Sequence, residues 1–334
     1  MTVSVRPADP SHPNFFGEVE GIDLRQPVNR EAVTAIEAGM DRFAALLFRD
    51  QRIDDAQQLA FSRNFGTLEQ EPAVDIGSIL SPRRINSFLI RWARNEFKRL
   101  RRQPGARKPH TRRLSRGVED ISELDIYNQM VGRDHPRRLY TLRNMLWHSD
   151  SSYKATPAKY ALLHARVIPS SGSSTEFADM RAAYDALDDE TRAMIQDLVC
   201  EHSQLYSRGV LGITDFTDRE RARWAPVPQR LVRRHPVTGR RSLYLSSHAG
   251  GIIGWTMPEA RVLLRDLTEH ATQREFVHVQ KWRQYDLVMY DNRVMMHRAR
   301  RYDRNEVREL HRTMVVDIGP TLLQPSAQSH SEDS

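Results

Sequence analysis

The sequence is almost free of cysteine: Cys200 is the only one among 334 residues. A single cysteine cannot form a disulfide within the chain, and it cannot supply the cysteine-rich cage of a structural zinc site. Any metal site in this chain must therefore use histidine and carboxylate side chains.

Long apolar runs are also missing. No stretch approaches the roughly 20 apolar residues that cross a bilayer, and the first residues lack the apolar segment of a secretory signal. We therefore expect a cytoplasmic protein that does not bind membranes. With 39% hydrophobic and 28% charged residues the composition is that of a globular protein, and the length suffices for a sizeable core.

The positive charge is concentrated in one segment. Between Ser81 and Gly117 there are 13 Lys or Arg residues and one acid, Glu96, which gives +12. Subtracting this from the net charge of +7 leaves −5 for the rest of the chain. We interpret about 81–118 as an insertion or lid, in which residues 85–100 carry a partial apolar stripe and could form a helix; a solvated loop is the alternative.

Nucleic-acid or acidic-partner binding through residues 83–116 is an alternative function. A basic cluster of this kind would give salt-dependent binding. The segment has few aromatic residues to stack on bases, however, and no helix-turn-helix or zinc-finger pattern occurs elsewhere. We do not expect nucleic-acid binding to be the main function.

Short strand-like runs dominate the remainder, with a few helical segments between them. Helices are expected at Glu31 to Ala45, from an Asp54 cap to Phe65, at 181–199 and at 258–271. Strands are expected at 15–25, 46–51, 139–148, 160–168, 242–247, 276–282, 286–292 and 312–317. This order predicts a mainly β fold, an antiparallel barrel or jelly roll decorated by helices. We expect a single domain over 1–318 and a flexible tail at 319–334.

A possible metal site begins with His148-Ser149-Asp150. In an extended chain residues i and i+2 point to the same side, so one ion can reach both side chains. The pattern alone is weak, because His330-Ser331-Glu332 in the tail repeats it.

Iron sites for oxygen chemistry need a second histidine beside such a pair, with open positions opposite. His297 is the best candidate, because it follows the strand-like run 286–292 and precedes a block of arginines. Since zinc also accepts two histidines and a carboxylate, a zinc hydrolase stays open at this point.

Four longer motifs resemble those of the taurine dioxygenase family, and within it the 2,4-dichlorophenoxyacetate dioxygenase branch. They are LWHSDSSY (146–153), STEFADMRAAYDAL (174–187), EHATQREFV (269–277) and DLVMYDNRVMMHRARRYD (286–303). The resemblance covers 15–75 and 119 to about 317. It implies a double-stranded β-helix (a cupin-like jelly roll) core decorated by helices, and it argues against a barrel without catalysis.

The resemblance assigns roles to five residues. His148, Asp150 and His297 match the family's iron ligands. Arg308 matches the arginine that pairs with the far carboxylate of 2-oxoglutarate, a task that suits the planar guanidinium. Thr175 matches the threonine that hydrogen-bonds the same carboxylate, and the last two residues favour 2-oxoglutarate chemistry over a zinc hydrolase.

The substrate site follows from the same resemblance. Arg312 matches the arginine that holds the acidic head of the substrate, and Asn144, His235 and His248 match positions near the substrate. The implied partner is a small anionic organic compound, first an aryloxyacetate-type aromatic acid, with alkyl sulfates, sulfonates and other carboxylic acids as alternatives. The implied cofactors are Fe(II), 2-oxoglutarate and O₂, with ascorbate as an activator in vitro, and the implied assembly is a homo-oligomer, dimeric or tetrameric.

Overall fold

The computed structural model describes residues 3–69 and 113–324. The possible helix at 85–100, most of the basic segment and the last ten residues of the predicted tail lie outside this range. No helix in the described ranges is long and apolar enough to cross a membrane.

The largest element is a seven-stranded sheet, ordered β1-β2-β3-β13-β5-β15-β4. Its strands are β1 (Ser4–Pro7), β2 (Gly17–Glu20), β3 (Ala45–Phe48), β13 (Leu287–Asp291), β5 (Ala158–Val167), β15 (Glu309–Val316) and β4 (Glu119–Ser122). Neighbouring strands are antiparallel except β2 and β3. Every residue of β13 is buried, which explains its continuous run of large side chains.

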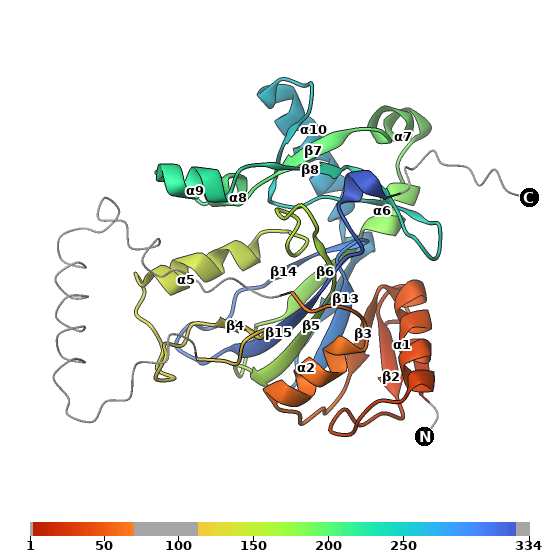
Figure 1. Cartoon of the computed structure of the whole chain (residues 1–334), viewed down its shortest axis with the longest axis vertical. Helices are drawn as coiled ribbons and strands as arrows, with labels where there is room; N and C mark the ends of the chain where they lie inside the picture. The colour runs from red at the N-terminus through yellow and green to blue at the C-terminus, as the bar shows by residue number, and fades with distance from the viewer. Residues whose placement is uncertain (1–2, 70–112, 325–334) are drawn as a thin grey trace, which may run out of the picture.

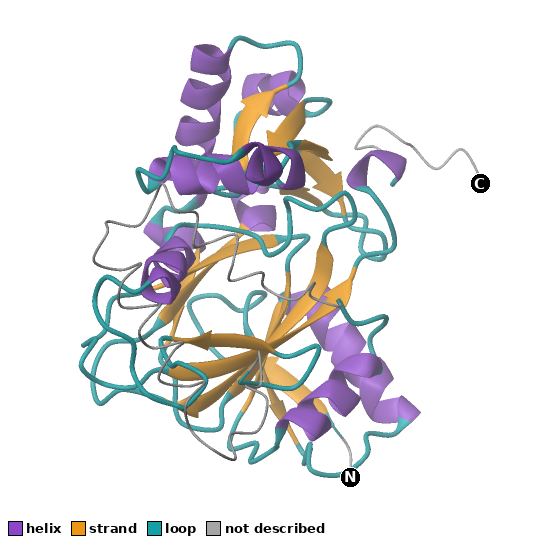
Figure 2. Ribbon diagram, turned by 60° about the vertical axis from the view of Figure 1, so that its left-hand side comes forward, coloured by secondary structure: helices purple, strands orange, loops and turns teal. Residues whose placement is uncertain are grey.

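A three-stranded antiparallel sheet, ordered β12-β6-β14, faces the large one (Figure 2). It comprises β12 (Val277–Gln280), β6 (Thr175–Asp179) and β14 (Met295–Ala299). One buried cluster joins the two sheets, because Phe177 and Met295 of the small sheet pack with Val288, Tyr290 and Leu310 of the large one. The core is therefore a sandwich of two sheets.

Helices α1 (Arg30–Phe43) and α2 (Asp55–Arg63) lie beside β2 and β3 and cover the outer face of the large sheet (Figure 1). Ile36 and Phe61 pack with Leu162 of β5 in one cluster. The predicted cap is confirmed: Asp54 accepts a hydrogen bond from the Gln57 backbone amide at 2.8 Å, in a capping box.

A third layer lies above the sandwich in Figure 1. It contains the sheets β11-β7-β8 and β10-β9 and most of the helices. Its elements are α6 (Met180–Asp185), α7 (Asp189–Ile195), β7 (Val199–His202), α8 (Gln204–Val210), α9 (Asp218–Arg223), β8 (Val227–Arg230), β9 (Val232–Arg234), β10 (Arg241–Leu243), β11 (Ala249–Ile252), α10 (Met257–Ala271) and η2 (Arg274–Phe276). The helix predicted at 258–271 is confirmed as α10.

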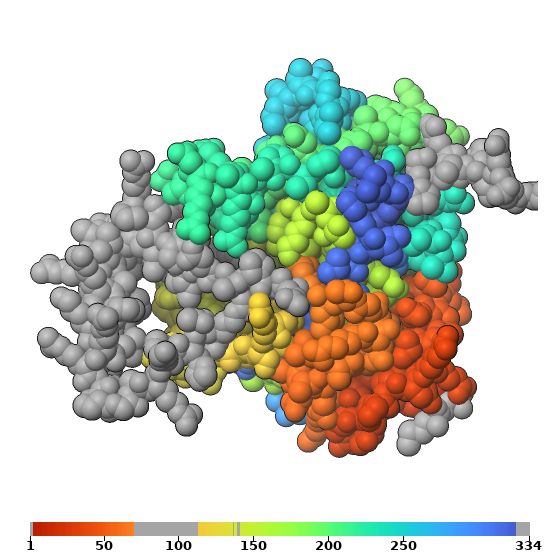
Figure 3. All heavy atoms as spheres, in the orientation of Figure 1, coloured from red at the N-terminus to blue at the C-terminus, as the bar shows by residue number. Residues whose placement is uncertain are grey.

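Part of the predicted tail is packed on this layer. The turn η3 (Thr321–Leu323) lies between the N-terminal helices and the upper elements (Figure 3). The Thr321 hydroxyl donates a hydrogen bond to Gln229 at 2.7 Å, and Gln324 contacts Arg233 at 2.7 Å. The chain is thus held by specific contacts up to residue 324.

Two expected elements are wrong. The run 139–148 is not a strand: it contains the second half of α5 (Pro136–Thr141) and all of η1 (Leu142–Met145). Pro136 suits the first turn of a helix, and the following Leu, Arg and Met residues favour helix over strand. The expected helix 181–199 is split into α6 and α7, because Asp188 caps a new helix through the Thr191 amide, and Val199 already begins β7.

Candidate active site

His148 and His297 are held together by backbone pairing. They form an isolated antiparallel bridge, with the His148 amide donating to the His297 carbonyl at 3.0 Å and the reverse bond at 2.9 Å. Their ring centroids are 4.2 Å apart. Asp150 follows His148 by two residues, and ligand atoms of all three buried side chains lie within 4.8 Å of one another. The three residues therefore meet although the strand expected before His148 is absent.

The ring of His148 is fixed by its backbone partner. Its Nδ1 lies 2.7 Å from the Leu146 carbonyl, which can only accept, so Nδ1 carries the hydrogen. Nε2 then has a free lone pair, 3.7 Å from Asp150 Oδ1. His297 presents its own Nε2 to the same carboxylate, 3.8 Å from Oδ2. The Nε2 atoms of both histidines thus lie beside the Asp150 carboxylate.

The protonation states of His148, His297 and Asp150 suit the binding of a cation. Burial, reinforced by His148, lowers the pKa of His297 to about 3, and burial also lowers the pKa of His148. Burial alone would raise the pKa of Asp150, but the positive charge of Arg312, aided by the hydrogen bond from Tyr290, outweighs burial and holds that pKa below its usual range. Two neutral imidazoles and one ionised carboxylate are the donor set of a divalent-metal site, and these residues fit such an ion.

Sequence reasoning missed two residues that hold Asp150 in place. The Tyr290 hydroxyl donates to Asp150 Oδ2 at 2.7 Å, and the Asp150 amide donates to the Asn292 side chain at 2.8 Å. Tyr290 is fully buried in β13. A tyrosine inside an apolar strand needs a hydrogen-bond partner for its hydroxyl, and that requirement was the available signal.

Arg308 lies just before β15 as a buried cation. Among the described residues, its Nη2 donates to the Ser173 carbonyl at 3.5 Å, and its Nε has no hydrogen-bond partner. Within residues 3–69 and 113–324 it forms no ion pair with a carboxylate, and burial lowers its pKa to about 10. The environment leaves room for an anion to pair with it. Thr175 begins β6, two residues after Ser173, and its hydroxyl oxygen accepts a hydrogen bond from Trp282 at 2.9 Å.

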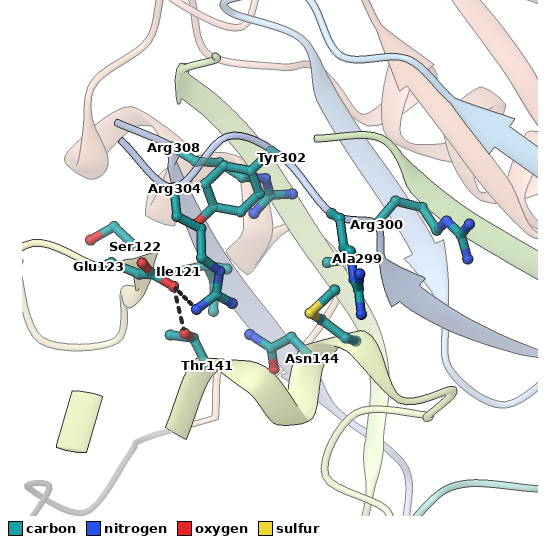
Figure 4. A pocket seen from close by; sticks show the side chains of 12 residues that line it. Ile121, Ser122, Glu123, Thr141, Asn144, Ala299, Arg300, Tyr302, Arg304 and Arg308 are labelled. Carbon is teal, nitrogen blue, oxygen red and sulfur yellow. Dashed lines mark hydrogen bonds and ion pairs between the residues drawn. The ribbon is translucent and has the colours of Figure 1, made fainter. Parts of the chain in front are cut away.

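Arg308 and Asn144 line one pocket, together with Tyr302, Arg304 and Glu123 (Figure 4). Glu123 forms an ion pair with Arg304 at 3.1 Å and accepts a hydrogen bond from the Thr141 hydroxyl at 3.1 Å, so its negative charge is already paired with an arginine. The structure thus brings Asn144 to the pocket of the candidate 2-oxoglutarate arginine.

The candidate substrate residues fall in three different surroundings. Arg312 contacts Asp150 and Glu119, so it adjoins the His-Asp-His cluster. His248 packs edge-on against His148, with centroids 6.5 Å apart, and its buried Nδ1 has no hydrogen-bond partner among residues 3–69 and 113–324. His235 instead binds Arg293 at 2.7 Å and lies 3.4 Å from Asp291. In the described chain it has no hydrogen bond, ion pair or ring contact with the cluster.

Comparisons with known proteins agree with this geometry. The model of the family described as taurine catabolism dioxygenase TauD, TfdA family matches residues 4–314. The chain is 40% identical over 310 residues to an alpha-ketoglutarate-dependent 2,4-dichlorophenoxyacetate dioxygenase of Cupriavidus pinatubonensis, covering 93% of this chain and 97% of the relative. It is 34% identical to an (S)-phenoxypropionate/alpha-ketoglutarate-dioxygenase of Sphingobium herbicidovorans, with 82% of each chain covered.

The three-dimensional comparison adds the fold. A crystal structure of AAD-2 in complex with Mn(II) and N-oxalylglycine superposes with a TM-score of 0.81 at 46% identity, over 97% of this chain and all of the other. A taurine dioxygenase structure from Burkholderia xenovorans superposes with a TM-score of 0.67 at 25% identity, over 96% of this chain and 93% of the other. The predicted jelly-roll core decorated by helices is confirmed.

Proposed function

The chain belongs to the taurine catabolism dioxygenase TauD, TfdA family, and from that premise we propose that it hydroxylates an aryloxyacetate-type aromatic acid. It is a 2-oxoglutarate-dependent dioxygenase that uses a metal ion. The observation that carries the proposal is the His148, Asp150 and His297 cluster with Arg312 directly on its carboxylate.

We assign the metal to His148 Nε2, His297 Nε2 and the carboxylate of Asp150. Two imidazoles and a carboxylate on one side leave the opposite positions open, which favours Fe(II) as the metal. Iron bound there would supply the activation of O₂, one atom of which would enter a substrate C–H bond while the other would enter the succinate formed from 2-oxoglutarate with loss of CO₂. The protein supplies orientation: Tyr290 and Asn292 fix Asp150, and the Leu146 carbonyl fixes the tautomer of His148.

For 2-oxoglutarate we assign the far carboxylate to Arg308, with Thr175 as a second hydrogen-bond donor. A buried guanidinium without a carboxylate partner is costly, and a bidentate carboxylate would relieve that cost. The Thr175 oxygen already accepts from Trp282, which leaves its hydrogen free to point at the ligand.

For the substrate we assign the acidic head to Arg312. This contact would place the carbon next to the carboxylate beside the metal. Hydroxylation of a carbon that also carries an ether oxygen gives a hemiacetal, which collapses to a phenol and glyoxylate. The names of the two relatives, a 2,4-dichlorophenoxyacetate and a phenoxypropionate dioxygenase, support this substrate class.

A substrate panel tests the proposal. Purified protein would receive Fe(II), 2-oxoglutarate and ascorbate, and succinate would be measured with aryloxyacetates, alkyl sulfates, taurine or no addition. We expect stimulation by aryloxyacetates and its loss in His148→Ala. Stimulation by sulfates or sulfonates alone would contradict the substrate class and keep the chemistry.

We also propose one domain over 1–318 that acts in the cytoplasm as a homodimer or homotetramer. The match of one family model across residues 4–314 supports a single domain, and a free, buried Cys200 fits a reducing compartment. Light scattering and cell fractionation test the assembly and the location.

A further inference from the structure

Glu119 is paired with Arg312, the arginine that we assign to the acidic head of the substrate. Glu119 opens β4 and lies directly opposite Arg312 in the antiparallel pairing of β4 with β15, so both side chains emerge on one face of the sheet. Arg312 Nε donates to Glu119 Oε2 at 2.6 Å, and Nη2 contacts the same oxygen. Their side chains are only 8% and 14% exposed.

This contact occupies the part of Arg312 that a substrate would use. A carboxylate meets a guanidinium bidentately along an edge formed by two N–H groups. Glu119 sits on the Nε and Nη2 edge, and Asp150 takes Nη1. A substrate carboxylate therefore has no free edge of Arg312 while Glu119 stays in place.

The local charge leads to the same conclusion. Arg312 is one cation between two carboxylates, and a metal ion bound by Asp150 would draw one of them away. Glu119 then remains as the carboxylate paired with Arg312. A substrate anion that approaches Arg312 therefore meets the carboxylate of Glu119. The site is poorly hydrated, so the two negative charges repel strongly.

We propose that Glu119 is a specificity-determining residue: it occupies Arg312 while no substrate is bound, and an anionic substrate must displace it. The inference rests on the proposed function of Arg312. Displacement has a route, because β4 is the last strand of the large sheet and pairs with β15 on one side only within the described ranges. Anions that bind Arg312 weakly, or present a single oxygen, would fail to displace Glu119.

A purely structural ion pair between β4 and β15 makes a different prediction. Removing its charge would weaken the fold and would affect charged and uncharged ligands alike. Removing a competitor strengthens the binding of anions alone, so the sign of the change in KM separates the two roles.

The test compares Glu119→Gln with the wild-type holoenzyme. The substrate is 2,4-dichlorophenoxyacetate, its uncharged amide serves as the neutral probe, and binding of both is also measured by calorimetry with protein loaded with Mn(II) and N-oxalylglycine. We expect KM and Kd for the acid to fall about tenfold, with the amide unchanged. Glu119→Asp, which keeps the charge, should stay near the wild-type KM.

Asp120→Asn is the matched control, because Asp120 is the next residue of β4 and binds Arg113 at 2.7 Å on the other side of the strand. It removes the same charge and should leave KM near the wild-type value. If the wild-type enzyme turns over the acid and the KM of Glu119→Gln for the acid is unchanged or higher, the proposed role of Glu119 is overturned. Wild-type protein that forms no succinate with any compound of the panel overturns the proposed function instead.

Discussion

The hydroxyl of Tyr290 donates a hydrogen bond to Asp150 Oδ2 at 2.7 Å, and the same oxygen atom of Tyr290 lies 3.4 Å from His297 Nε2. Tyr290 is fully buried in β13, and its ring packs 4.7 Å from the ring of His297. One side chain of the large sheet thus contacts two of the three residues assigned to the metal.

Tyr290→Phe should weaken metal binding without removing a ligand. The ring stays, but Asp150 loses a donor that fixes its orientation, and the loss of such a partner commonly costs about tenfold or more in metal affinity. Titration with Mn(II) measures the change by calorimetry. Unaltered affinity would mean that Arg312 and the Asn292 contact suffice to orient Asp150.

Arg308→Ala should raise the KM for 2-oxoglutarate by about a hundredfold or more, because a charged, buried hydrogen-bond pair is worth several kcal/mol. Arg308→Lys should recover only part of this loss, since lysine lacks the planar fork. The KM for the organic substrate should change much less. Equal increases in both KM values would contradict the assignment of Arg308 to 2-oxoglutarate.

Metal removal should lower the stability. A ligand present at about 100 times its Kd adds about 2.7 kcal/mol to the free energy of unfolding, so a chelator should lower Tm by several degrees. In His148→Ala, Mn(II) should produce no such shift. A shift that persists in this variant would indicate a metal site other than the cluster.

A stability change with pH is expected from His311 of β15. Its Nδ1 lies 2.6 Å from Asp55 and its Nε2 2.9 Å from Glu309. Burial lowers its pKa, but the two carboxylates outweigh this, so the folded pKa is raised. The contribution to stability is then complete below the unfolded pKa of about 6.5 and is lost as pH rises through the folded pKa.

Urea unfolding at several pH values checks this dependence. Wild-type stability should fall above about pH 6.5, the ordinary histidine pKa, whereas His311→Gln should lose much of that slope. If the free energy of unfolding changes with pH equally in both proteins, groups other than His311 cause the dependence.

How much the sequence could predict depended on the range of the interactions. The Asp54 cap of α2 is local, and it was predicted. The run 139–148 is predicted as a strand but lies mostly in α5 and η1, because a short apolar run does not distinguish helix from strand. The choice of His297 as the partner of His148 rests on its position after the strand-like run 286–292 and on the family motifs, since no local rule brings such distant residues together.

Contacts set by strand register were beyond sequence reasoning. Glu119 faces Arg312 only because β4 pairs with β15 in one register, and a shift of one residue would turn Asp120 to that face instead. The difference between His248 beside the cluster and His235 beside Arg293 also depends on the folded chain. Residue types and family motifs alone gave the two histidines equal weight.

The most direct test of the account measures two products in one reaction. With 2,4-dichlorophenoxyacetate, Fe(II), 2-oxoglutarate and O₂, the wild-type protein should release succinate and 2,4-dichlorophenol in equal amounts, and Arg312→Ala should release little of either. Succinate formed without phenol would mean that the substrate carbon is not hydroxylated beside the ether oxygen. Neither product, from protein that binds metal and 2-oxoglutarate, would contradict the proposed substrate.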